Sequence, residues 1–168
     1  MAKTVCFTGH RQIPEADFAR LGELLRRVVE EQIAQGATIF RTGGALGFDT
    51  LAALTVLALR RIHPHIRLEL FLPCPTQTRG WADQDRMLYT QILEQANAYR
   101  YTSQGYYTGV LQMRNRALVE GADTCIAYLR CHDGGTAYTV QLALKQQLEF
   151  INLQDLLEQS NPEQESDF

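Results

Sequence analysis

A short stretch, Asp133-Gly134-Gly135-Thr136, has the residue types of an anion-binding turn. It follows the apolar run from Thr124 to Leu129, which is typical of a buried strand, and precedes an apolar helical pattern from Ala137 to Leu148. Glycines let a ligand approach the backbone closely, and the unpaired amides at a helix start attract phosphate. The same residues also suit a plain turn, so this stretch alone leaves both interpretations open.

Two further glycine stretches occupy equivalent places after predicted strands. The first is Gly9-His10-Arg11, and the second runs from Gly43 to Gly47, including Gly44. A forked arginine such as Arg11 suits phosphate, whereas His10 either donates to a ligand or caps neighbouring backbone. The second stretch differs by one position from the dinucleotide-binding fingerprint and lacks a Walker lysine, so neither standard motif is present.

Other polar and aromatic residues are candidates for the same site. Asp49, in the first turn of a predicted helix, either complements the helix dipole or binds ribose hydroxyls. Trp81 and Tyr106 lie in loops, where they either stack on a base or close the core. Arg114 and Arg116 are two apart on a predicted helix and point in different directions, so we expect only one to reach the site.

The sequence describes a binding site more clearly than a reaction. It contains no Ser-His-Asp order and no zinc-type spacing among its four cysteines, so we assign no metal and leave the catalytic residues unknown. No resident cofactor is assigned either.

The pattern of elements predicts an α/β fold. We expect strands over 4–8, 37–42, 66–72, 99–102, 124–129 and 149–152, separated by helices over 14–35, 48–62, 81–96, 110–120 and 137–148, with a short helix over 153–157. Such alternation requires right-handed crossovers, hence a three-layer Rossmann-like fold with a mainly parallel sheet flanked by helices on both faces. All three glycine stretches then lie at the carboxyl edge of the sheet, where ligands bind.

Composition bounds the class of protein. With 168 residues, residues 1–158 form one predicted domain, and 159–168 form a flexible acidic tail. A net charge of -3 makes nucleic acid an unfavoured partner. We expect reduced thiols, no signal peptide, no membrane span and a cytoplasmic location. The oligomeric state is left open, a homo-oligomer included.

Four motifs together resemble the YpsA-like family of the SLOG superfamily. They are Phe7-Thr8-Gly9-His10-Arg11, Gly43-Gly44-Ala45-Leu46-Gly47-Phe48-Asp49, Gln112-Met113-Arg114-Asn115-Arg116 and Gly134-Gly135-Thr136. The likeness runs from about Thr4 to Ile151 and implies a Rossmann-like fold. It also implies a small-molecule ligand, a phosphorylated nucleotide or a derivative resembling ADP-ribose, with Arg11 and Arg116 as counter-charges and the glycine amides holding phosphate.

Two relatives in that superfamily supply alternatives. The "Lonely guy" phosphoribohydrolases, which cleave nucleoside monophosphates, carry two glutamates where this chain has Tyr138 and Thr139. Because that loss removes the acidic group expected at the sugar, hydrolysis is the first alternative. Single-stranded nucleic-acid binding of the DprA type is the second.

Overall fold

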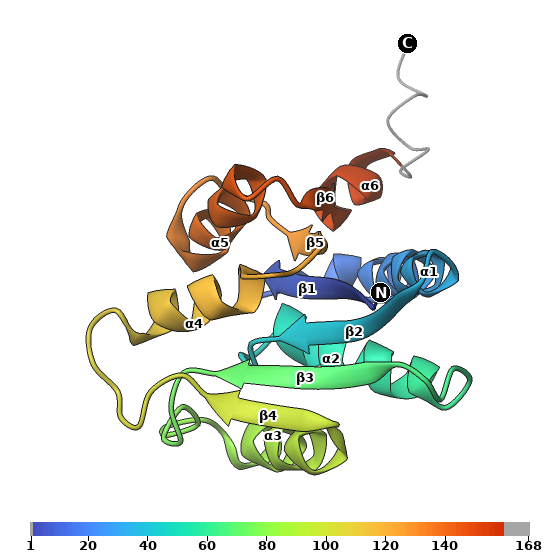
Figure 1. Cartoon of the computed structure of the whole chain (residues 1–168). Helices are drawn as coiled ribbons and strands as arrows, with labels where there is room; N and C mark the ends of the chain where they lie inside the picture. Colours follow the sequence, from blue (N-terminus) through green and yellow to red (C-terminus); the bar gives the residue numbers. More distant parts are fainter. Residues whose placement is uncertain (1, 160–168) are drawn as a thin grey trace.

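The computed structural model describes residues 2–159, and its strands form one six-stranded parallel sheet in the order β4-β3-β2-β1-β5-β6 (Figure 1). The strands are β1 (Lys3–Gly9), β2 (Ala37–Thr42), β3 (Arg67–Leu72), β4 (Ala98–Tyr101), β5 (Thr124–Tyr128) and β6 (Glu149–Asn152). The helices are α1 (Glu15–Ala34), α2 (Phe48–Arg60), α3 (Asp83–Gln95), α4 (Val110–Val119), α5 (Gly134–Lys145) and α6 (Leu153–Gln159). The predicted α/β class and Rossmann-like arrangement are confirmed.

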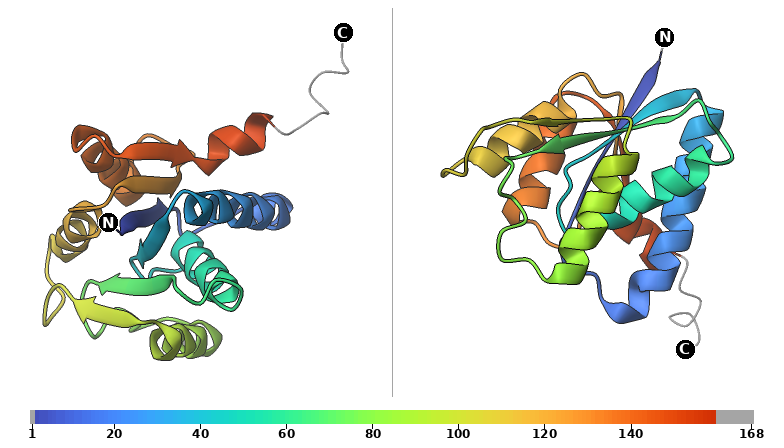
Figure 2. Two further views of the ribbon diagram at one scale, coloured as in Figure 1. Left: turned by 45° about the vertical axis from the view of Figure 1, so that its right-hand side comes forward. Right: turned by 90° about the horizontal axis from the view of Figure 1, so that it is seen from below.

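Helices cover both faces of the sheet. Helix α1 packs against α2 and α6, and α2 packs against α3, whereas α4 and α5 pack together on the opposite face (Figure 2). This division follows from the connections, because right-handed crossovers from β1 through β4 place α1, α2 and α3 on one side. The chain then returns through α4 to β5, on the other side of β1.

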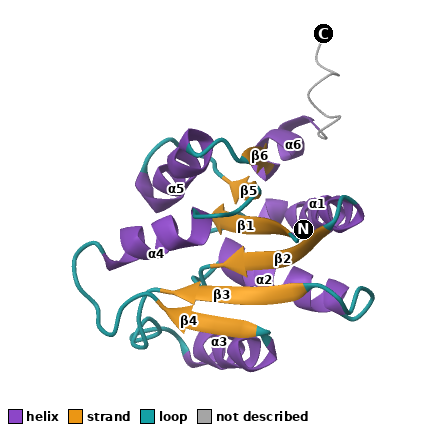
Figure 3. Ribbon diagram, viewed as in Figure 1, coloured by secondary structure: helices purple, strands orange, loops and turns teal. Residues whose placement is uncertain are grey.

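The return places a switch in strand order at β1. Strand β1 pairs with β2 on one side and with β5 on the other, with Phe7 opposite Ile126 in the second pair. Loops after β1 and β5 therefore diverge at the carboxyl end of the sheet, which is the usual ligand position in open α/β sheets. The loops at this end join strands to helices in Figure 3.

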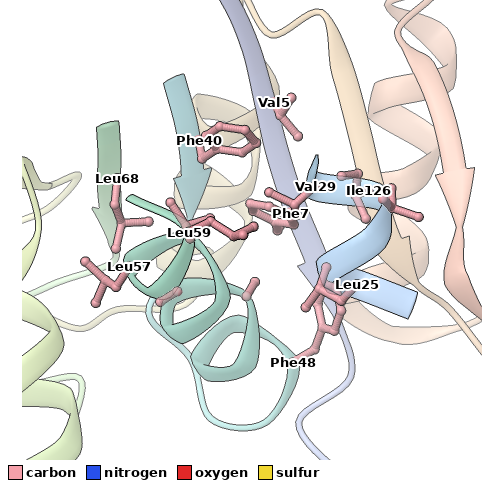
Figure 4. Packing of buried hydrophobic residues seen from close by; sticks show 14 of the residues in the cluster. Val5, Phe7, Leu25, Val29, Phe40, Phe48, Leu57, Leu59, Leu68 and Ile126 are labelled. Atoms are coloured by element: carbon pink, nitrogen blue, oxygen red, sulfur yellow. The ribbon is translucent and has the colours of Figure 1, made fainter. Parts of the chain in front are cut away.

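The core on the α1 side explains why these elements form. Alternate residues of the strands enter it, and Phe7 stacks near Phe40 with ring centroids 6.1 Å apart (Figure 4). Phe48, the first residue of α2, packs edge-on against Phe7. The first turn of α2 is thereby held against the end of β1, which positions the glycine stretch between β2 and α2.

Two element boundaries differ from the prediction in a way that matters for the site. Helix α5 begins at Gly134, three residues before the apolar pattern starts, so Gly134, Gly135 and Thr136 form its first turn. It ends at Lys145 and is followed by Gln147 at φ 62°, a left-handed residue that ends the helix before Leu148. Gln159 closes α6, and the rest of the predicted tail lies outside the described residues.

Candidate functional site

A cavity of about 400 Å³ opens between α4 and α5 above the carboxyl end of β1. We call it the site cavity. Its wall combines the end of β1, the loop after it, the first turn of α2 and one face of α4 with the first turn of α5. The lining residues are Phe7, Thr8, Gly9, His10, Arg11, Ala45, Asp49, Leu111, Arg114, Asn115, Leu118, Gly135 and Thr136. The three glycine stretches predicted to share one edge of the sheet do meet there.

The amino end of α5 supplies anion-binding groups. The helix has no side-chain cap at Asp133, so its first amides have no acceptor from a capping group. Gly135 and Thr136 line the site cavity, and Thr139 Oγ1 donates to the Gly135 carbonyl oxygen over 2.9 Å one turn further on. The positive end of the helix dipole therefore lies at the cavity wall.

The glycines of the other two stretches serve close packing. A side chain at Gly9 would overlap the ring of Phe48, and one at Gly47 would overlap the backbone of Arg11. Gly47 also has φ 77°, a conformation that disfavours other residues. The Phe48 amide donates to the His10 carbonyl oxygen over 3.1 Å, so the loop after β1 lies directly on the start of α2.

Gly43 and Gly44 are likewise engaged within the protein. The Arg114 guanidinium donates to the Gly43 carbonyl oxygen, and Gln77 Nε2 donates to that of Gly44 over 3.0 Å. A side chain at Gly43 would overlap Arg114, and one at Gly44 would overlap Leu72. These contacts explain both glycines by packing, and neither lies among the residues that line the site cavity.

Arg114 is the arginine of α4 that reaches the cavity. Its side chain is 6% exposed, and its Nε donates to Asn115 Oδ1 over 2.8 Å. Burial lowers the pKa of Arg114, while the nearby Asp49 raises it. Arg116, which the resemblance makes a counter-charge, is exposed and is not among the lining residues within 2–159. Helical phase places one of the two arginines inward, and it is Arg114.

Asp49 is the carboxylate of the cavity wall. It is 6% exposed, and its Oδ2 accepts a hydrogen bond from the Ala45 amide over 3.1 Å. Burial raises the pKa of Asp49 to about 6, against the lowering effects of Arg114, the Ala45 amide and Arg11. Its hydrogen bond secures the glycine stretch before α2, and its charge disfavours phosphate at that end of the cavity.

His10 and Arg11 differ in how they are engaged. His10 Nε2 accepts a hydrogen bond from the Arg130 amide over 2.8 Å, so the ring caps the loop after β5. Burial is the main cause that lowers the pKa of His10, and the charge of Arg130 adds to it. Arg11 is exposed, and its side chain makes no hydrogen bond or ion pair with residues 2–159. That guanidinium is free to bind an anion.

A second cavity of about 420 Å³ adjoins the first, and we call it the aromatic cavity. Arg11 and Leu111 line both, so they form the boundary between the two. Its other lining residues are Pro73, Thr76, Gln77, Arg79, Trp81 and Tyr106. The Trp81 ring lies edge-on to Tyr89 at 5.6 Å, which holds the indole in place, whereas Tyr106 is 71% exposed.

The residues at the positions of the hydrolase glutamates do not line the site cavity. Thr139 is fully buried and bonds back to its own helix, and Tyr138 is half-buried. Among the lining residues within 2–159, the only carboxylate is Asp49, which comes from α2.

Several lining residues escaped the sequence reasoning as ligand contacts. In the sequence Asn115 stands out only as a member of a motif, yet its amide lines the cavity and lies 3.9 Å from where a Gly135 Cβ would stand. Thr8 and Arg79 gave no distinct signal, because each looks like an ordinary strand or loop residue. The stretch containing Asn115 was itself one of the recognisable motifs, so that residue could have been found.

Residues 2–159 lack two features that would indicate another class of protein. No group of three or more histidine, cysteine or acidic side chains lies close enough to hold a metal ion. No helix in this part of the chain combines the length and apolar character needed to cross a membrane.

The sequence comparisons agree with one another. A family model described as the YspA SLOG family matches residues 7–156. A UPF0398 protein of Halalkalibacterium halodurans is 31% identical over 130 residues, covering 73% of this chain and 69% of the relative. An uncharacterised protein, YoqJ, from the SPbeta prophage of Bacillus subtilis is 27% identical over 139 residues, covering 75% and 81%.

Solved structures show the same fold at low identity. DNA processing protein A of Helicobacter pylori, described for its unique mode of binding single-stranded DNA, superposes with a TM-score of 0.63 at 20% identity. The match covers 94% of this chain and 72% of that protein. DprA of Streptococcus pneumoniae gives 0.62 at 12% identity, over 89% of this chain and 49% of the larger protein. The net charge made nucleic acid an unfavoured partner, but a fold relative binds it.

Proposed function

The chain belongs to the YspA SLOG family, and from this premise we propose that it binds or senses a phosphorylated nucleotide or nucleotide derivative of the ADP-ribose type. One observation carries the proposal: an uncapped helix start and a free arginine open into a cavity that adjoins an aromatic one. A phosphate and a planar base are the two groups that such a pair of cavities suits.

The phosphate would lie at the amides of Gly135 and Thr136, with Asn115 and Arg11 as further donors. Arg114 stabilises this end of the cavity, because its hydrogen bonds to the Gly43 carbonyl oxygen and to Asn115 Oδ1 hold it in place. The base would enter the aromatic cavity and stack on Trp81, whose indole is positioned by its neighbour.

Isothermal titration with ADP-ribose, NAD and AMP tests the proposal. A ligand at a concentration a hundredfold above its dissociation constant should also raise the free energy of unfolding, measured by denaturation, by about 2.7 kcal/mol. Arg11→Gln should weaken binding about tenfold or more, because it removes a charge-assisted hydrogen bond. Arg61→Gln, an exposed arginine after α2, is the matched control and should leave the affinity unchanged. A well-folded protein that binds none of the three would contradict the proposal.

A paired titration separates the two ends of the ligand. Trp81→Ala should weaken ADP-ribose by about 1–3 kcal/mol through lost stacking, and leave ribose 5-phosphate unaffected. If both ligands weaken equally, Trp81 supports the fold rather than the base.

Hydrolysis is the alternative that the cavity favours less. Its lining supplies Asp49 as a carboxylate, but that group is buried and already accepts a hydrogen bond from the Ala45 amide. We predict no release of free base from AMP above the uncatalysed rate. Base release that depends on Asp49, measured by chromatography, would reverse this order of preference.

Single-stranded nucleic acid is a second candidate, favoured by the exposed Tyr106 and by Arg79 in the aromatic cavity. Aromatic platforms beside arginines bind single strands through stacking and phosphate contacts. Anisotropy with a labelled oligonucleotide should then show binding at low salt, with a logarithmic slope of about -0.7 per phosphate contact. Displacement by ADP-ribose would place both ligands in the same cavities, and no binding at low salt would exclude this candidate.

A further inference from the structure

One part of the sheet lacks a helix layer. On one face α2 contacts β3 and α3 packs beside α2, while on the other face α4 contacts β3 and no helix of the described chain lies over β4 (Figure 1). On the first face Leu68, Leu70 and Leu72 enter the core, so the alternate residues of β3, Arg67, Glu69 and Phe71, point to the other face. We call this uncovered area, with Arg100 of β4 and Glu120 after α4, the open sheet face.

A hollow of about 380 Å³ marks the open sheet face. Phe71 forms its floor, with the Arg100 guanidinium over its ring at 4.3 Å and that of Arg41 at 5.0 Å. Arg41 also donates to the Glu120 carbonyl oxygen over 2.6 Å, so its side chain is occupied in holding the end of α4. The floor is therefore ordered before any partner binds.

The charged side chains of this hollow make no ion pair within the described chain. The charged residues that line it, Arg41, Arg100, Glu69 and Glu120, form no ion pair with any residue from 2 to 159. The ion pairs of the described chain lie on other parts of the surface, such as Arg26 with Glu30 on α1. Two cations and two anions, none of them in an ion pair, therefore share the hollow.

We propose that the open sheet face is an interface with a second copy of this chain, related by a two-fold axis. An isologous contact requires a self-complementary surface, and a hollow lined by two arginines and two glutamates offers cations and anions that can meet across the axis. A polyanion such as a nucleic acid or an anionic membrane would be repelled by Glu69 and Glu120. In the dimer, Arg100 of one copy pairs with Glu69 of the other, twice.

The dimer would also brace α4. Ala117 and Glu120 of this helix region line the hollow, while Arg114 and Asn115 line the site cavity on the same helix. A second copy seated over the hollow would thus fix the helix that carries part of the ligand site. The interface inference stands without the ligand proposal, because it rests on different side chains.

Charge reversal with the full chain tests the pairing. Sedimentation at about 100 μM, above the dissociation constant of an ordinary specific dimer, should give a dimer for the natural sequence. Arg100→Glu alone and Glu69→Arg alone should each be monomeric, because each brings like charges together twice. An equimolar mixture of these two variants should restore the dimer, since every Arg then meets a Glu. Arg61→Glu is the matched exposed control and should remain dimeric.

Each other result overturns the inference. If the natural sequence stays monomeric at this concentration, the chain does not form the proposed dimer. If the single variants stay dimeric, the dimer forms through another surface than the open sheet face. Folded single variants whose mixture stays monomeric reject the Arg100–Glu69 pairing. Circular dichroism of each variant supplies the check of folding.

Discussion

Replacing Gly135 with valine separates an anion site at α5 from an ordinary helix start. The residue has no left-handed φ, and a Cβ there would meet nothing nearer than Asn115 Nδ2 at 3.9 Å. Valine has a helix propensity close to that of glycine or better, so we expect the free energy of unfolding of the ligand-free protein to change by about 1 kcal/mol or less. The added methyl groups would stand where the phosphate approaches.

The expected loss of affinity follows from the hydrogen bonds displaced. A hydrogen bond to a charged group contributes about 1.5–3 kcal/mol, so losing one or two of them should weaken ADP-ribose about 100-fold. Urea denaturation of the free protein and isothermal titration of the same preparation supply both quantities. Undiminished affinity in stable Gly135→Val protein would refute the placement of phosphate at this helix.

The neighbouring glycine provides the internal contrast. Gly134 has φ 91° with open space around it, so Gly134→Val should cost about 1–3 kcal/mol of stability through backbone strain. The Gly134→Val variant should therefore lose stability, whereas the Gly135→Val variant should lose affinity for the ligand. A large loss of stability at both positions would indicate that the stretch serves the turn alone.

Three further predictions concern the residues around the site. Asp49→Asn should alter the pH dependence of stability, because burial raises the pKa of Asp49 in the folded protein to about 6. Denaturation at each pH should show that the natural protein loses about 3 kcal/mol of stability relative to this variant as the pH rises from about 4 to 7. Arg114→Ala should lower the free energy of unfolding by about 3 kcal/mol or more in urea denaturation, since it leaves the Gly43 carbonyl oxygen without its donor and Asp49 without its nearby cation. A loss under about 1 kcal/mol would contradict that role. Gly47→Ala should cost about 2–5 kcal/mol by the same measurement, because its Cβ overlaps the Arg11 backbone and its φ is positive, and a neutral result would refute the close packing of these loops.

The order and type of every element could be predicted because local pattern and tertiary burial agree. The alternation of Leu68, Leu70 and Leu72 and the apolar run of β5 both match the faces that they bury. The meeting of the loops after β1, β2 and β5 at one edge of the sheet could also be predicted, since these strands are parallel.

The role of each glycine could not be predicted, because it depends on contacts across the sequence. Gly43 and Gly44 match a phosphate-binding pattern, yet the structure explains them through Arg114 and Leu72, which lie far away in the chain. Helical spacing separates Arg114 from Arg116 but does not say which one faces inward, because that depends on how α4 is rotated against β3 and α5.

The sequence of β3 contains a pattern that predicts the open sheet face. Alternation of charged Arg67 and Glu69 with the leucines of β3 indicates one polar face on a strand that is central to the sheet. Central parallel strands are normally apolar on both faces, so such alternation indicates a missing layer.

Titration of ¹⁵N-labelled protein with ADP-ribose, followed by NMR, tests the central claim most directly. The amide signals of Gly135 and Thr136 and the indole signal of Trp81 report both ends of the proposed site in one experiment. Ligand binding as proposed predicts large shifts of all three signals that saturate together at one dissociation constant. If these signals stay in place at a hundredfold excess of ADP-ribose, NAD and AMP, the chain does not bind such ligands at the carboxyl edge of its sheet.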